Sequence, residues 1–155
     1  MGHETLLYGA IVVPGRKGLQ KDGHSEEFNR QAIASLPLLD TFPFLTRDVF
    51  AYPAVIRAEN SYQSLVIPFG LSLKSMGPEL ETDFWLSWRQ KFEKLLRQMC
   101  WQQASVQVIP ELYQSYSCYW TPDEVSQDRP IEAWTYKIFR HSLPEGLEIE
   151  AAEGL

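Results

Sequence analysis

The sequence predicts a single α+β domain in which two helices pack on one face of a mostly antiparallel sheet of about five strands. Two observations support this fold class. Segments with strand-like alternation of apolar residues are interrupted by two segments with helical spacing, in the order strand-helix-strand-helix-strand-strand-strand. The chain of 155 residues is 45% hydrophobic and 13% aromatic, which suffices for the core of one domain. No repeat or linker divides residues 1–155.

The first half of the chain contains one clear strand and one clear helix. Residues 5–13 (TLLYGAIVV) are apolar on both faces, which is typical of a central strand. The helix predicted over 25–36 begins at Ser25, a good N-cap residue, and ends before Pro37. Residues 37–60 combine three prolines with many large apolar side chains, so we expect an irregular segment pinned to the domain. It is either a lid over one end of the core or a binding loop.

The middle of the chain pairs a strand with a long helix. Residues 61–74 alternate with period two, and Pro68, which cannot donate a ladder hydrogen bond, places this strand at an edge or at a bulge. The helix predicted over 79–101 has acids near its start and bases in its second half, as the helix dipole favours. Its apolar residues form one broad face that we assign to the core: Phe84, Trp85, Trp88, Phe92, Leu95, Leu96 and Met99.

Three closely spaced strands follow the long helix. Alternating residues over 104–108, 112–120 and 132–140 predict an antiparallel meander. Residues 143–155 are acidic and are expected to form a frayed tail.

The charge of the chain is unevenly distributed. Its net charge of −6 arises after residue 101, because the basic and acidic residues before that point cancel. Such a field repels nucleic-acid phosphates and favours a cationic partner. The simpler interpretation is that these acids only keep the protein in solution.

No motif identifies a reaction, a metal or a cofactor. The glycine-rich stretch after the first strand lacks the spacing of a phosphate-binding loop, and the three histidines are scattered. Cys100 and Cys118 lie outside any CxxC pair, and a catalytic pairing with His141 would require a proximity that the sequence does not establish. We predict no catalytic residue, no metal site and no cofactor. Without a secretory signal or a membrane-length apolar run, we expect a cytoplasmic protein with reduced thiols.

The last strands are rich in aromatic and acidic residues, which is typical of a surface that binds a basic protein. The alternative is aromatic packing between neighbouring strands. If the surface interpretation holds, the residues that contact the partner are Tyr113, Tyr116, Tyr119, Trp120, Asp123, Glu124, Asp128, Glu132 and Trp134.

Three functional hypotheses follow. The first is a non-enzymatic protein-binding module that neutralises a basic partner, in the manner of acidic bacterial immunity or inhibitor proteins that block a toxin or a nuclease. The second is a small-molecule-binding protein or enzyme with a pocket under residues 37–60. The third is a structural homodimer that associates through the Pro68-containing edge or the tryptophan-rich helix.

Overall fold

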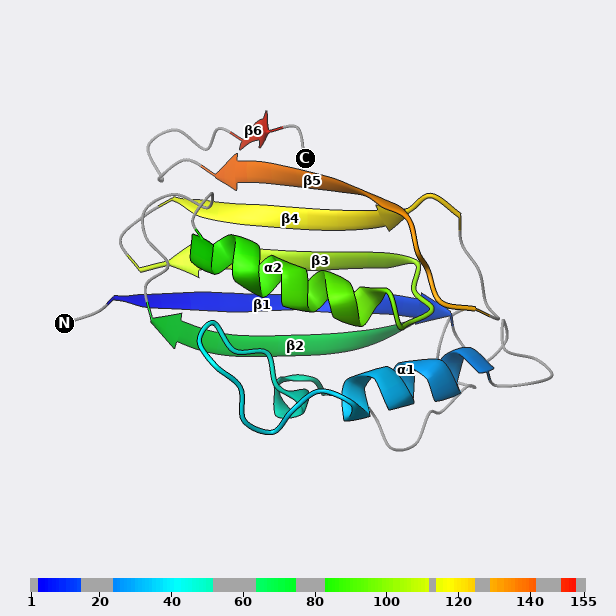
Figure 1. Ribbon diagram of the computed structural model, residues 1–155. Helices are drawn as coiled ribbons and strands as arrows, with labels where there is room; N and C mark the ends of the chain where they lie inside the picture. The colour runs from blue at the N-terminus through cyan, green and yellow to red at the C-terminus, as the bar shows by residue number, and fades with distance from the viewer. Residues whose placement is uncertain are drawn as a thin grey trace.

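The protein is built on one antiparallel sheet whose strand order is β2-β1-β3-β4-β5-β6 (Figure 1). This computed structural model describes residues 3–14, 24–51, 64–74, 83–111, 114–124, 129–141 and 149–152. The strands are β1 (Glu4–Pro14), β2 (Ser64–Lys74), β3 (Gln103–Pro110), β4 (Ser115–Pro122), β5 (Trp134–His141) and β6 (Ile149–Ala152).

The strand pairing confirms the predicted arrangement of the sheet. β1 lies between β2 and β3, so the strand that is apolar on both faces is central. β2 is an edge strand, as Pro68 indicated. β3, β4 and β5 are consecutive antiparallel neighbours and form the predicted meander.

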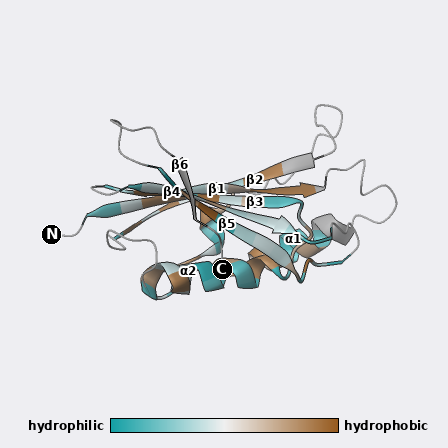
Figure 2. Ribbon diagram, turned by 90° about the horizontal axis from the view of Figure 1, so that it is seen from above, coloured by the Kyte–Doolittle hydropathy of each residue, from teal (hydrophilic) through white to brown (hydrophobic). Residues whose placement is uncertain are grey.

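Both α-helices lie on one side of the sheet (Figure 2). The described helices are α1 (His24–Ala34), the short 3-10 helix η2 (Arg47–Val49) and α2 (Asp83–Leu96). α2 lies in front of β3 and β1, and α1 lies beside the β2 edge (Figure 1). No helix among the described residues is both long enough and apolar enough to cross a membrane.

α2 ends five residues earlier than the sequence predicted. Its last hydrogen bonds tighten into three-residue steps, with the Gln98 amide donating to Leu95 O at 2.9 Å and the Met99 amide to Leu96 O at 3.2 Å. The indole of Trp101 also donates to the Leu96 carbonyl, at 3.0 Å, so this carbonyl at the helix end accepts two hydrogen bonds. Beyond the helix end, segments distant in sequence hold the backbone, because the Ile131 amide donates to Met99 O and the Gln102 amide donates to Val12 O.

The core between α2 and the sheet contains a chain of packed aromatic rings, two contacts of which are stacked and one edge-on. Trp88 is fully buried and stacks on Trp85 and Phe92, with ring centroids 5.6 and 5.2 Å away. Phe92 continues the chain to Trp120 of β4 at 5.0 Å. Phe84 is the exception to the predicted apolar face, because 47% of it is exposed and it points to the 37–51 segment rather than to the sheet.

One strand was not predicted. β6 pairs with β5 through Ile138↔Ala152 to His141↔Ile149, so part of the expected tail over 143–155 extends the sheet. The remainder of that tail lies outside the described residues.

Candidate functional site

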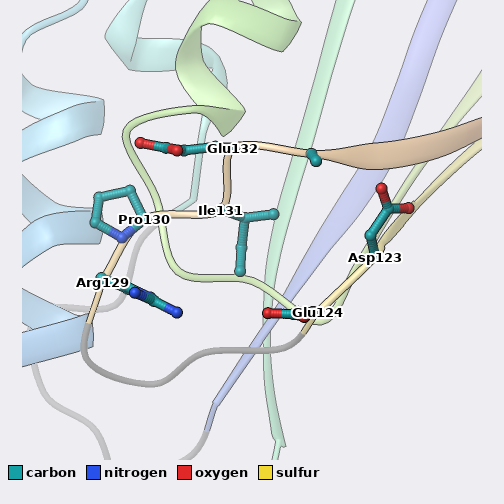
Figure 3. Close-up of a pocket in the computed structure, with 7 residues that line it drawn as sticks. Asp123, Glu124, Arg129, Pro130, Ile131 and Glu132 are labelled. Atoms are coloured by element: carbon teal, nitrogen blue, oxygen red, sulfur yellow. The ribbon is translucent and has the colours of Figure 1, made fainter.

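A pocket of about 600 Å³ opens at the end of the sheet where β4 leads into β5 (Figure 3). Its walls come from the two flanks of one connection, the residues that follow β4 and the residues that precede β5. The described residues that line it are Asp123, Glu124, Arg129, Pro130, Ile131, Glu132 and Ala133.

Backbone hydrogen bonds hold the two flanks of the pocket together. The Asp123 amide donates to Ala133 O at 3.1 Å, which continues the β4–β5 ladder beyond its last strand pair. The Thr135 hydroxyl donates to the Asp123 carboxylate at 3.4 Å. Asp123 is therefore fixed relative to the incoming β5.

The floor of the pocket is anchored to the end of α2. The Ile131 amide donates to Met99 O at 3.0 Å, and the Ile131 side chain is buried in the core. The Cys100 thiol donates to Arg129 O, also at 3.0 Å. Hydrogen bonds thus hold the backbone that carries the acidic side chains against the buried core of the domain. A backbone held in this way favours a preformed site.

The pocket carries an excess of negative charge. Asp123, Glu124 and Glu132 present carboxylates, and all three residues are exposed. Arg129 is the one base among the described lining residues, and Figure 3 shows its guanidinium and the Glu124 carboxylate pointing toward one another. A concave surface lined by charge of one sign concentrates ligands of the other sign. The arrangement suits a cationic group.

The predicted partner-binding residues do not form one surface. The structure brings Asp123, Glu124 and Glu132 together at the pocket, and Tyr113 and Asp128 lie outside the described residues. Tyr116 and Trp120 are buried on the helix side of the sheet, so they are not available to a partner. The prediction is wrong for these two residues because alternate positions of β4 face α2.

The two remaining aromatic residues of the prediction also lie apart from the acids. Tyr119 lies on the other face of the sheet, where its ring packs edge-on against Phe139 at 5.6 Å. Trp134 directly follows the pocket residue Ala133, but its ring packs against Trp101 at 6.0 Å and under the Arg97 guanidinium at 4.5 Å. Cross-strand packing thus accounts for most of the aromatic content of β4 and β5.

A serine–histidine pair on β4 and β5 was not predicted. The Ser117 hydroxyl lies 2.6 Å from His141 Nε2 and also contacts Gln107 Oε1 at 2.5 Å. Only 3% of Ser117 is exposed, and its hydroxyl is held by hydrogen bonds on both sides. Nucleophilic catalysis needs a hydroxyl that a substrate can reach, so this contact is structural. The pair is invisible in the sequence because it depends on the register between strands.

The segment predicted as a lid or a binding loop is pinned to α2. Lys91 Nζ bonds Asp40 Oδ2, Thr41 O and Pro43 O, each at 2.9 Å. Leu45 and Phe50 are buried against the core, so the described residues 37–51 cover it at the β2 edge. Residues 52–60 lie outside the described part of the chain.

The same segment presents apolar side chains to solvent. Leu38 is 62% and Leu39 is 91% exposed, and Phe42 packs edge-on against Phe84 of α2 with ring centroids 5.0 Å apart. The segment combines the features of both interpretations, because one side of it covers the core and the other side displays two leucines.

Among the described residues, no group of three His, Cys, Asp or Glu side chains is placed to hold a metal ion. Cys100 and Cys118 are both buried and form no disulfide bond. Comparisons with protein-family models, curated proteins and solved structures give no match to this chain.

Proposed function

We propose that this protein is a non-enzymatic binding module that docks a basic protein partner through the acidic pocket between β4 and β5. The observation that carries the proposal is the pocket itself, a space of about 600 Å³ whose described lining includes the three acids Asp123, Glu124 and Glu132. Lysine or arginine side chains of a partner have the charge and the reach to enter it.

The character of the lining favours a protein over a small molecule or a nucleic acid. Small-molecule sites of this volume are lined mainly by apolar and aromatic side chains, whereas charged residues dominate here. A phosphate backbone would be repelled by the three carboxylates. Electrostatic complementarity of this kind steers association and selects partners of the opposite charge.

A basic toxin or nuclease is the kind of partner that this charge distribution suits, and the protein would then act as its inhibitor. The acidic excess of the whole chain lies after residue 101, on the same part of the sequence as the pocket. We place the protein in the cytoplasm, where the two buried thiols remain reduced.

The proposal is tested by affinity capture with a matched pair of charge variants. The pocket variant neutralises three carboxylates with Asp123→Asn, Glu124→Gln and Glu132→Gln. The control variant removes the same number of charges at the opposite end of the sheet and at the start of α2, with Glu4→Gln, Asp83→Asn and Glu111→Gln. Wild type and control should retain the same basic protein from native lysate at low salt, and the pocket variant should lose it.

Salt provides the second arm of the capture experiment. Raising the ionic strength should release the retained protein, because exposed charges are screened within a Debye length. Retention of no basic protein at low salt, or equal retention by the pocket variant and the wild type, would contradict the proposed function.

A further inference from the structure

The face of the sheet that points away from α1 and α2 is uncovered by any described helix (Figure 2). We call it the open face, and it consists of the alternate positions of β1 to β5 that do not point into the helix-side core. Large apolar residues on it are exposed, namely Leu6 at 40%, Tyr8 at 49% and Val66 at 55%. Val12 and Val66 are directly paired across β1 and β2, and Leu6 is paired with Ile109 of β3.

The open face is almost free of charge. Three residues at these positions of β1 to β5 are formally charged. Glu4 and Lys74 lie at the ends of their strands, so Lys137 is the one charged residue in the interior of the face. The other positions hold aliphatic and aromatic residues, serine, threonine, glutamine, glycine, proline and the histidine of the Ser117 contact. The chain as a whole is 22% charged. The face of a sheet that points to solvent normally carries polar and charged residues. The central part of a protein–protein interface, in contrast, contains few charged residues.

We propose that the open face is the contact surface of a homodimer, in which it packs against the open face of a second copy. The net charge of the chain and the lack of acids in the interior of the open face indicate a second copy as the partner. With a net charge of −6, two copies repel each other wherever acidic surfaces meet, but the interior of the open face carries no acid. Two such faces bury apolar surface without bringing carboxylates together.

The area of the open face matches what a stable dimer needs. Five strands spaced ~4.8 Å apart, each contributing about eight residues at ~3.4 Å, give a face of roughly 650 Å². Two copies would bury about 1,300 Å², which lies at the lower end of the range of about 1,200–2,000 Å² for specific interfaces. We expect a dimer that forms at micromolar concentration and dissociates on dilution.

A twofold axis makes the face self-complementary. If the axis lies in the plane of the interface, perpendicular to β1 and through Gly9, Leu6 meets Val12 of the second copy and Tyr8 meets Ala10. Two sheets packed in this way lie about 10 Å apart. Lys137 is on β5, toward the side of the face, where its ammonium group reaches solvent. None of the described pocket residues belongs to β1 to β5, on which this inference rests, so it does not depend on the proposed function.

Sedimentation of the full chain across the micromolar range tests the dimer. Wild type should shift with concentration from the monomer mass of 17.9 kDa to twice that mass. The variant Tyr8→Lys with Val66→Lys places two cations in the interface and should remain monomeric. The control variant Leu38→Lys with Leu39→Lys changes residues that are at least as exposed, on the 37–51 segment, and should dimerise as wild type does.

A milder pair of substitutions guards against misfolding of the lysine variant. Tyr8→Gln with Val66→Thr adds no charge, and it should raise the dimer dissociation constant at least tenfold while far-ultraviolet circular dichroism stays unchanged. A wild-type protein that remains monomeric throughout the range would overturn the proposal. So would a dimer that survives both open-face variants, or one that is lost in the leucine control.

Discussion

The side-chain amide of Asn29 and the backbone of Cys100 exchange two hydrogen bonds. Asn29 Nδ2 donates to Cys100 O at 3.0 Å, and the Cys100 amide donates to Asn29 Oδ1 at 2.8 Å. Both residues are buried. Because the Cys100 thiol also donates to Arg129 O, this contact links α1, the end of α2 and the floor of the acidic pocket.

Replacing Asn29 should destabilise the whole domain. Asn29→Ala removes the hydrogen bonds that Asn29 makes with the buried amide and carbonyl of Cys100, which should cost about 2–4 kcal/mol of unfolding free energy. Asn29→Asp retains an acceptor but loses the donor, so it should not restore stability. Urea denaturation measures the unfolding free energy of both Asn29 variants. The control is Gln31→Ala at an exposed position, which should stay within about 0.5 kcal/mol of wild type. An Asn29→Ala variant as stable as this control would contradict the assigned role.

Replacing Gly9 of β1 and Gly70 of β2 by alanine should have different effects on stability. A Cβ on Gly9 would lie 1.9 Å from the carbonyl oxygen of Ser105, whereas a Cβ on Gly70 meets nothing closer than Tyr8 Cβ at 3.6 Å. Gly9→Ala should therefore cost at least about 2 kcal/mol, because β1 and β3 must separate. Gly70→Ala should be neutral or slightly stabilising. Thermal denaturation of the two variants checks the contrast, and equal melting temperatures would refute the close approach.

The sequence was sufficient for the fold because its main features are local. Period-two alternation located the strands, Pro68 identified β2 as an edge, and short connections predicted the antiparallel meander. The end of α2 escaped prediction because Trp101 and segments distant in sequence terminate it. Phe84 was misassigned to the core because it packs against Phe42 of a segment whose path has no periodicity.

The candidate site was predictable only in part, for a reason that lies in strand geometry. Alternation shows which residues share a face, but it does not show which face the helices cover. The predicted surface therefore mixed buried Tyr116 and Trp120 with Tyr119 of the open face. The acids Asp123, Glu124 and Glu132 share one pocket because they lie in the connection between β4 and β5, and such residues stay near the surface whichever face the helices cover.

Asp40 should make stability depend on pH at the acidic end. Partial burial raises the pKa of this carboxyl, but hydrogen bonds from Leu45 N, Lys91 and Thr41 N outweigh burial, so its pKa lies below the ordinary value of 3.8. A depressed folded-state pKa contributes stability that is present above the unfolded-state pKa and is lost as pH falls through the folded-state pKa.

The variant Asp40→Asn isolates this contribution. It should cost about 1–3 kcal/mol at neutral pH, because the Lys91 ammonium loses its charged partner. The difference between wild type and variant should shrink below about pH 4. Urea denaturation between pH 2 and pH 7 measures it, with the exposed carboxyl variant Glu4→Gln as a control. If the difference in unfolding free energy between wild type and Asp40→Asn stays constant over this pH range, the ionised carboxylate of Asp40 does not stabilise the 37–51 segment.

Cys118 should be unreactive in the native protein. Burial raises the pKa of its thiol to about 12, even though the Tyr136 hydroxyl and the Arg89 charge act in the opposite direction. Since only the thiolate attacks disulfide reagents, labelling with such a reagent at pH 8 should proceed at the rate of unfolding. Both cysteines should label at once in denaturant. Rapid labelling of Cys118 in the folded state would show that the interior beneath α2 is open to solvent.

The central claim is that the acidic pocket recognises cationic side chains, and a nuclear magnetic resonance titration with a hexa-arginine peptide tests it most directly. At low salt, the backbone signals of Asp123, Glu124, Glu132 and Ala133 should move first, and added salt should reverse the shifts. Neutralising the three pocket carboxylates should abolish the response, while the control variant at Glu4, Asp83 and Glu111 should respond as wild type does. Shifts spread evenly over all exposed acids, or unchanged in the pocket variant, would contradict the claim.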